Sequence, residues 1–295
     1  MMQIKNNIIS FFVLIIMFAS CSSVKNPARM KKYVYFETSK GDFVIGLYEG
    51  TPKHKNNFIK NCNTGIYDSC LMYSIKPWSL FRVGIRAGEK EENVLKGDFN
   101  NHKIIPPEIN SKLINKTGAV GMLRVEDESN VNKDSDSRLF YLVEGMQLNA
   151  HLLSSLEAVN NSKLFAKYID KYLELPGNEV LKDSMKILSK KKYSDTYKNF
   201  HLSLRDSVRP MMKEEKVELF SLNKNQTETY QGIGGSPNDD NKYTVFGEIV
   251  WNQQIMKVFS IKNFDINFKP TIDIYFFHCK VMNKRQFKEF LKEKL

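Results

Sequence analysis

The sequence has few of the residue patterns that mark metal, nucleotide or hydrolytic sites. It contains only four cysteines and five histidines, with no Cys-x-x-Cys pair and no two histidines at metal-ligand spacing. It also lacks an HExxH motif, a G-x-S-x-G nucleophile elbow and a phosphate-binding P-loop. We therefore expect neither a metal nor another cofactor, and a hydrolytic enzyme is the least favoured of three functional hypotheses.

The charge balance is basic, with a formal net charge of +11. The lysines are scattered, however, and the densest basic run spans only residues 190–193, without any nucleic-acid-binding motif beside it. We therefore do not expect a nucleic-acid partner. Hydrophobic residues make up 42% of the chain and charged residues 26%, which is typical of a soluble globular protein. The 295 residues suffice for one large domain, or for one domain with an insertion.

One long apolar run is present, over residues 8–20, and it follows Lys5. It is too short to span a bilayer comfortably and is typical of a signal peptide, which we place at residues 1–20. Phe18 to Cys21 resembles a bacterial lipobox, so we expect Cys21 to be lipidated and residues 21–32 to form a tether. The alternative is an ordinary signal peptide cut near Ala19 or Ser20.

A lipidated Cys21 would hold the protein on a membrane, since two acyl chains give stable anchoring. The residues that follow carry no acidic export tag. We therefore expect a location in the cell envelope, on the outer membrane and facing the periplasm. Cys62, Cys70 and Cys279 then remain in an oxidising compartment, where at most one pair can bond. Whether Cys62 and Cys70 bond is left open, and buried small side chains are the expected role of all three.

Residues 33–145 have the alternating pattern of short strands. A hairpin is predicted over 33–50 with its turn at 39–42, then a helix over 51–65 with Thr51 as its N-cap. An apolar strand follows, then a glycine- and charge-rich loop over 84–101 and further strands over 118–125 and 137–145. Such strands separated by glycine turns favour a closed antiparallel barrel, because closure removes exposed edges.

The pattern changes at residue 146. Residues 146–225 have helical spacing and are predicted to be an α-helical insertion, with Pro176-Gly177 between two helices and Pro210 interrupting a later one. Strands resume over 226–282, and residues 283–295 form a basic amphipathic helix. Its apolar side, with Phe287, Phe290 and Leu291, is expected to pack on the barrel, to fray or to rest on a membrane surface.

Five segments in order resemble the cyclophilin-type peptidyl-prolyl isomerase family. They are residues 38–58, 65–68 with the strand that follows, 118–122, 137–145 and 234–250. The last resembles the Bacteroidetes-type lipoproteins that carry a helical insertion. The resemblance implies a mostly-β fold, an eight-stranded antiparallel barrel with capping helices, interrupted here by the insertion.

The resemblance also implies a catalytic arginine, which this chain does not have. Prolyl isomerisation has a barrier of about 18–20 kcal/mol, and a fixed guanidinium can stabilise the twisted amide nitrogen by donating a hydrogen bond. The family's Phe-His-Arg positions are Met72, Tyr73 and Ser74 in this sequence. Serine is neutral and too short to replace an arginine.

The other groove positions implied by the resemblance have also changed. The full set of peptide-groove residues is Met72, Tyr73, Ser74, Leu80, Arg82, Leu123, Arg124, Leu139, Tyr141 and Tyr243. We favour a non-catalytic lipoprotein that binds exported polypeptide or a partner protein through this apolar groove, enlarged where the arginine is absent. The alternative is an active isomerase and folding chaperone in which Arg82 or Arg124 replaces the missing guanidinium. Whether the protein is an enzyme is therefore left open.

Overall fold

The computed structural model describes residues 26–89, 104–124, 130–191, 194–260 and 264–294. Cys21 and most of the predicted loop over 84–101 lie outside these ranges. The chain divides into two compact units. The first contains Met1–Met146 and Gly235–Leu295, and the second is Gln147–Gly234. Among the described residues, no helix is both long enough and apolar enough to cross a bilayer.

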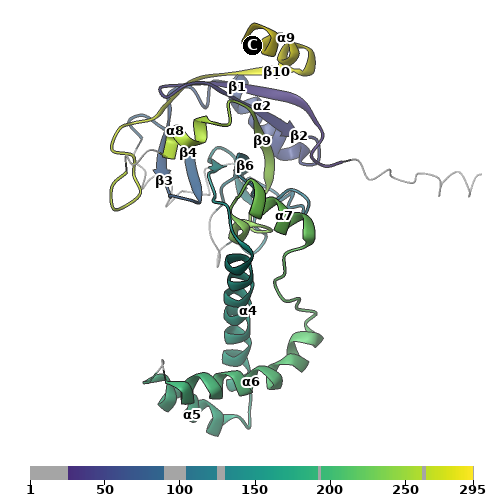
Figure 1. Cartoon of the computed structure of the whole chain (residues 1–295), viewed down its shortest axis with the longest axis vertical. Coiled ribbons are helices and arrows are strands. Elements are labelled where there is room, and N and C mark those ends of the chain that lie inside the picture. The colour runs from purple at the N-terminus through teal and green to yellow at the C-terminus, as the bar shows by residue number, and fades with distance from the viewer. Residues whose placement is uncertain (1–25, 90–103, 125–129, 192–193, 261–263, 295) are drawn as a thin grey trace, which may run out of the picture. The chain divides into compact units, whose positions relative to one another are not determined.

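The first unit contains a closed antiparallel barrel of eight strands (Figure 1). Their bounds are β1 (Met30–Thr38), β2 (Phe43–Tyr48), β3 (Cys70–Ile75), β4 (Leu80–Arg86), β6 (Ala119–Met122), β8 (Phe140–Val143), β9 (Val245–Trp251) and β10 (Tyr275–Asn283). Around the barrel the order is β1-β10-β3-β4-β8-β6-β9-β2, and the short β5 (Ile104–Ile105) and β7 (Ser135–Asp136) pair separately. The predicted mostly-β, eight-stranded antiparallel barrel is therefore confirmed.

Aromatic rings fill the interior of the barrel. The ring of Phe36 lies 5.4 Å from that of Phe43, 5.6 Å from Phe276 and 6.0 Å from Phe140, measured between centroids. All four side chains are fully buried. The strands alternate, so that every second residue faces this core and the others face outward.

Helix α2 (Pro52–Asn63) closes the core through residues at i, i+4 and i+8, namely His54, Phe58 and Cys62. Thr51 is the N-cap residue as predicted, but its side chain makes no capping hydrogen bond. The carboxylate of Glu108 caps the helix instead, accepting hydrogen bonds from the amides of Lys53 and His54, both at 3.0 Å. The short helices η1 (Pro237–Asp239) and α8 (Ile255–Ser260) also belong to this unit.

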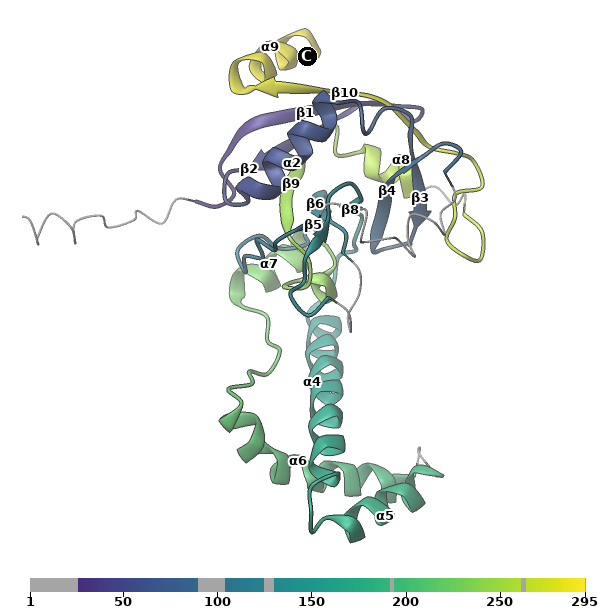
Figure 2. The same ribbon diagram turned by 180° about the vertical axis from the view of Figure 1, so that it is seen from behind.

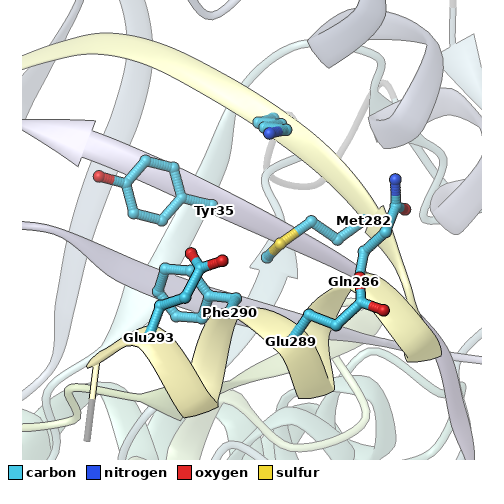
Figure 3. A pocket seen from close by; sticks show the side chains of 7 residues that line it. Tyr35, Met282, Gln286, Glu289, Phe290 and Glu293 are labelled. Carbon is cyan, nitrogen blue, oxygen red and sulfur yellow. The ribbon is translucent and has the colours of Figure 1, made fainter.

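The C-terminal helix α9 (Lys284–Lys294) packs on the outside of the barrel, which is one of the outcomes expected for its apolar side. Phe287 stacks on Tyr33 at 4.1 Å, and Phe290 packs edge-on against Tyr35 at 5.6 Å. A cavity of about 360 Å³ remains between α9 and strands β1 and β10, and Figure 3 shows its side chains. Its lining residues are Tyr35, Lys280, Met282, Gln286, Glu289, Phe290 and Glu293.

The second unit is helical. Its helices are α4 (Ala150–Leu173), α5 (Glu179–Ser189), α6 (Asp195–Glu214) and α7 (Lys224–Gly232). Helices α5 and α6 lie against the C-terminal part of α4 (Figures 1 and 2), where Phe165, Ile169 and Leu173 belong to the same buried cluster as Leu204 and Val208. The boundary placed at residue 225 falls inside α7, which belongs to this unit.

The prediction that Pro210 interrupts a helix is wrong. Helix α6 runs through Pro210 without a break. Proline removes one backbone donor from a helix, but the apolar stripe of α6 continues on both sides of it. Val208 and Met212 are both buried in the helical core, and their packing holds the two halves of the helix in line.

Candidate functional site

Strands β3 and β4, which carry active-site positions implied by the family resemblance, pair unevenly. The partner of Leu71 is Ile85, whereas the partner of the next residue, Met72, is Val83. Gly84 is therefore an extra residue on β4, a β-bulge. Its φ of +126° is a backbone conformation that residues with a side chain rarely adopt, and glycine suits the position for that reason.

A second bulge, on β3, compensates for the first. Val83 pairs with Met72, but the next residue of β4, Arg82, pairs with Ser74. Tyr73 is therefore the extra residue on β3. Met72 points into the barrel core, whereas the Tyr73 side chain packs in a second cluster, described next. Ser74 is half-buried and belongs to neither cluster.

An apolar cluster covers the other face of this part of the barrel, and we call it the outer cluster. Its members are Tyr48, Tyr73, Leu80, Ile85, Leu113, Ala119, Leu123, Leu139, Tyr141, Val143, Tyr243 and Val245. Six of the ten predicted groove residues are thus brought together here. The other four are Met72, Ser74, Arg82 and Arg124.

The outer cluster is packed rather than open. Tyr73 and Leu139 are each 5% exposed, and Tyr141 is fully buried. Four of the five residues expected to border an apolar cleft beside Ser74, namely Leu80, Leu123, Leu139 and Tyr141, are thus buried in this cluster. None of the residues that line the cavity under α9 belongs to the outer cluster.

Tyr141 is fixed from several sides. Its hydroxyl donates a hydrogen bond of 2.8 Å to Oδ1 of Asn115, whose backbone amide donates to Oδ1 of Asp240 at 2.8 Å. The ring packs edge-on against Tyr243, with 5.5 Å between centroids. On the paired strand, a Cβ at Gly121 would overlap the Tyr141 phenol, so a glycine is required there. The sequence did not identify Asn115, Asp240 or Gly121 as part of this site.

The two candidate arginines differ in position. Arg82 pairs across the sheet with both Ser74 and Tyr141, so the three side chains start from the same face of the barrel wall. The Arg124 guanidinium lies over the ring of Tyr243, 5.5 Å from its centroid. This is a cation–π arrangement, and it holds a positive charge at the edge of the outer cluster.

A buried hydrogen-bond chain, also missed from the sequence, links three segments near α2. Nδ1 of His54 lies 2.8 Å from Oε2 of Glu108, and Nε2 lies 3.0 Å from Oγ of Ser135. A carboxylate only accepts, so Nδ1 carries the proton, and in the neutral ring Nε2 accepts from the serine. The arrangement of carboxylate, imidazole and serine hydroxyl is that of a catalytic triad, but His54 and Ser135 are almost completely buried. These hydrogen bonds therefore connect α2 to the β5–β7 region, and the buried groups are not accessible to a substrate.

Metal chemistry has no candidate in the described ranges, where no group of three or more His, Cys, Asp and Glu side chains is arranged to hold an ion. Among the described residues, the outer cluster offers apolar packing, the tyrosine hydroxyls and the guanidinium at its edge. These groups are buried, apart from the guanidinium at the edge, and they do not present a donor from β3 to a twisted amide.

Comparison with known proteins supports a family assignment. Residues 33–153 match the sequence model described as cyclophilin type peptidyl-prolyl cis-trans isomerase/CLD. No curated protein has a significantly similar sequence.

Two solved structures of a cyclophilin type peptidyl-prolyl cis-trans isomerase from Cryptosporidium parvum are similar to the chain. The first has 10% identity and a TM-score of 0.47, over 87% of this chain and 99% of that one. The second, determined in the presence of the dipeptide Ala-Pro, has 11% identity and a TM-score of 0.47, over 85% and 99%. The matched residues 33–153 carry all or part of six of the eight barrel strands (β1, β2, β3, β4, β6 and β8), so this part of the chain is similar to the cyclophilin-type peptidyl-prolyl cis-trans isomerase family.

Proposed function

We propose that this protein is a non-catalytic member of its family that binds exported polypeptide or a partner protein at the cell envelope. One observation carries the proposal. The face on which the family implies a proline pocket is occupied by the protein's own side chains, with Tyr73 inserted by a bulge and packed beside Leu139 and Tyr141. A proline ring would have to displace buried apolar groups, and no arginine on β3 would meet it.

Binding without catalysis is consistent with the chemistry of the surrounding surface. Isomerisation requires a donor that stabilises the twisted amide more than the planar one. Apolar contacts and a surface guanidinium bind the twisted and the planar amide about equally, so they give affinity for the peptide without accelerating its isomerisation. The proposed ligand is therefore an extended, apolar polypeptide segment or a matching surface of a partner protein.

The test measures isomerisation and binding on the same sample of the full chain, with an active cyclophilin as a positive control. We expect a proline-containing peptide to isomerise at its uncatalysed rate, over tens to hundreds of seconds. We also expect a fluorescently labelled unfolded model protein, kept reduced and alkylated, to bind with a measurable change in anisotropy. If the peptide isomerises faster with the chain present, the non-catalytic proposal is wrong, and if neither effect is seen, polypeptide binding is wrong.

The alternative function is an active isomerase that uses a substituted arginine. The position of the Arg124 guanidinium over Tyr243 is the observation that favours it. In that case Arg124→Ala would abolish the acceleration while Arg82→Ala would not, and the reverse result would identify Arg82. Ser74→Arg alone is expected to leave the rate unchanged, because Tyr73 still fills the face.

We also propose the lipid anchor at Cys21, with residues 1–20 as a signal peptide that directs the chain to the periplasmic side of the outer membrane. The lipobox-like sequence before Cys21 supports this proposal. Cells fed a labelled fatty acid should incorporate the label into the wild-type chain and not into Cys21→Ser, which should move to the soluble fraction. Equal labelling, or equal membrane association, of the two proteins would rule out the anchor.

A further inference from the structure

Three buried cysteines belong to the main core cluster of the barrel. Cys62 ends the buried stripe of α2, Cys70 begins β3, and Cys279 lies in β10. The buried Tyr67 belongs to the same cluster. In this structure all three cysteines are free thiols.

Cys62 and Cys279 are neighbours within this group. Helix α2 packs directly on β10. Just after α2, Oδ1 of Asp68 lies 3.4 Å from Nδ1 of His278, the residue that precedes Cys279. Both cysteines therefore lie in the core on two packed elements, and burial first and the neighbouring Cys279 second raise the pKa of the Cys62 thiol. Each of these two cysteines is 4% exposed.

Cys70 is held differently. Its thiol donates a hydrogen bond to the carbonyl oxygen of Ile66 at 3.3 Å. Burial raises the pKa of this thiol to about 12. Cys70 is therefore a packed side chain with its own partner, and it provides an internal control for the other two.

We propose that Cys62 and Cys279 form a disulfide when the chain folds in the presence of a disulfide oxidant, and that Cys70 stays a thiol. The thiolate of one cysteine attacks the oxidant, forming a mixed disulfide and releasing one thiol. The second thiolate then attacks the mixed disulfide, which closes the protein bond and releases the second thiol. Two protein thiols lose their protons and two electrons, and one oxidant disulfide becomes two thiols. The biological setting rests on the proposed envelope location, where such oxidants persist.

The bond should form during folding rather than afterwards. The attacking species is a thiolate, and burial holds the pKa of Cys62 well above its ordinary value. Once the core has closed, the thiol is protonated and almost inaccessible. We therefore expect the folded, reduced protein to resist oxidation and the refolding protein to oxidise readily.

The experiment compares two refolding reactions of the full chain. The protein is unfolded in guanidinium with reductant and refolded either with reduced glutathione alone or with a reduced and oxidised mixture. Free thiols are then alkylated in denaturant, and a non-reducing digest is read by mass spectrometry, with Cys21 followed through its own peptide. We expect the mixture to give a peptide pair joined through Cys62 and Cys279 with Cys70 alkylated, and a melting temperature several degrees above that of the reduced protein.

Two results would overturn the proposal: alkylation of both Cys62 and Cys279 after oxidative refolding, or a link that includes Cys70. Cys70→Ser should keep the link and the rise in melting temperature, whereas Cys279→Ser should lose both. If Cys279→Ser does not fold, the wild-type peptide map decides alone. The glutathione reaction does not depend on where the protein resides. A link formed there, combined with free thiols in protein taken from cells, would argue against the envelope location and not against the pair.

Discussion

Replacing His54 with alanine is expected to lower the free energy of unfolding of the barrel unit by about 3 kcal/mol. The imidazole is completely buried and fills the space between Glu108 and Ser135, with a hydrogen bond to each. Its removal leaves a cavity and takes one partner from each of two polar side chains. The measurement is guanidinium unfolding followed by tryptophan fluorescence, since both tryptophans, at positions 78 and 251, lie in this unit.

The matched control is His278→Ala. His278 also faces a carboxylate, that of Asp68 at 3.4 Å, but its side chain is 58% exposed. Exposed ion pairs of this kind contribute little to stability, so we expect His278→Ala to lower the free energy of unfolding by at most about 0.5 kcal/mol. Ser135→Ala should fall between the two, at about 1 kcal/mol, since it removes a single hydrogen bond. If His54→Ala lowered the free energy of unfolding no more than His278→Ala, the buried hydrogen bonds of His54 to Glu108 and Ser135 would not stabilise the fold.

The same variant should change the response to acid. Burial raises the pKa of Glu108, but hydrogen bonds from the His54 ring and from the amides of His54 and Lys53 outweigh it and hold the pKa below its ordinary value. Because the folded pKa is the lower one, Glu108 stabilises the fold above the ordinary carboxyl pKa, and this contribution is lost as the pH falls through the folded pKa. His54→Ala removes one of these donors, so less stability should be lost between neutral and acidic pH than in the wild type.

The sequence predicted the barrel well because its signals are local. The apolar run at residues 43–48 and the i, i+4 pattern of α2 are each contained in a short window of sequence. The site was harder to predict from the sequence, because it depends on the register between paired strands. Two compensating bulges, at Gly84 and Tyr73, decide which side chain of β3 enters the outer cluster. A glycine inside an apolar strand is the one local signal for such a bulge.

Long-range polar contacts left no signal in the sequence at all. Glu108 caps α2 across 54 positions, and Asp240 holds Asn115 across 125. Each residue looks like an ordinary surface polar group in its own segment. The predicted break at Pro210 failed for the opposite reason, since a strong local signal was overridden by the packing of α6 against α4.

Replacing Gly145 with alanine is expected to lower the free energy of unfolding by about 3 kcal/mol or more. Two costs add together at this position. Its φ of +60° is left-handed, which costs an alanine about 1–2 kcal/mol. A Cβ would also overlap the backbone of Gly235, lying 2.5 Å from its carbonyl carbon. Backbone atoms cannot turn aside as a side chain can, so the two segments would have to separate.

The control separates the two costs. Gly65 has almost the same backbone angle, with φ of +66°, but the nearest atom to an added Cβ is a side-chain oxygen of Asp68, which can move. Gly65→Ala should therefore show only the conformational cost. The comparison uses the same unfolding assay, with the tryptophans reporting on the barrel unit. Equal losses for the two variants would mean that the close approach of Gly145 to Gly235 does not exist in solution.

The result bears on how the barrel accommodates its insertion. The chain leaves the barrel unit after Met146 and returns at Gly235, and these two residues exchange backbone hydrogen bonds of 3.2 and 3.0 Å. With its ends held side by side, an inserted segment acts on the barrel as a closed loop, and the entropic cost of such a loop grows only slowly with its length. Gly145→Ala forces the two ends apart. We therefore expect the barrel unit to lose its stability even though every residue of the helical unit is unchanged.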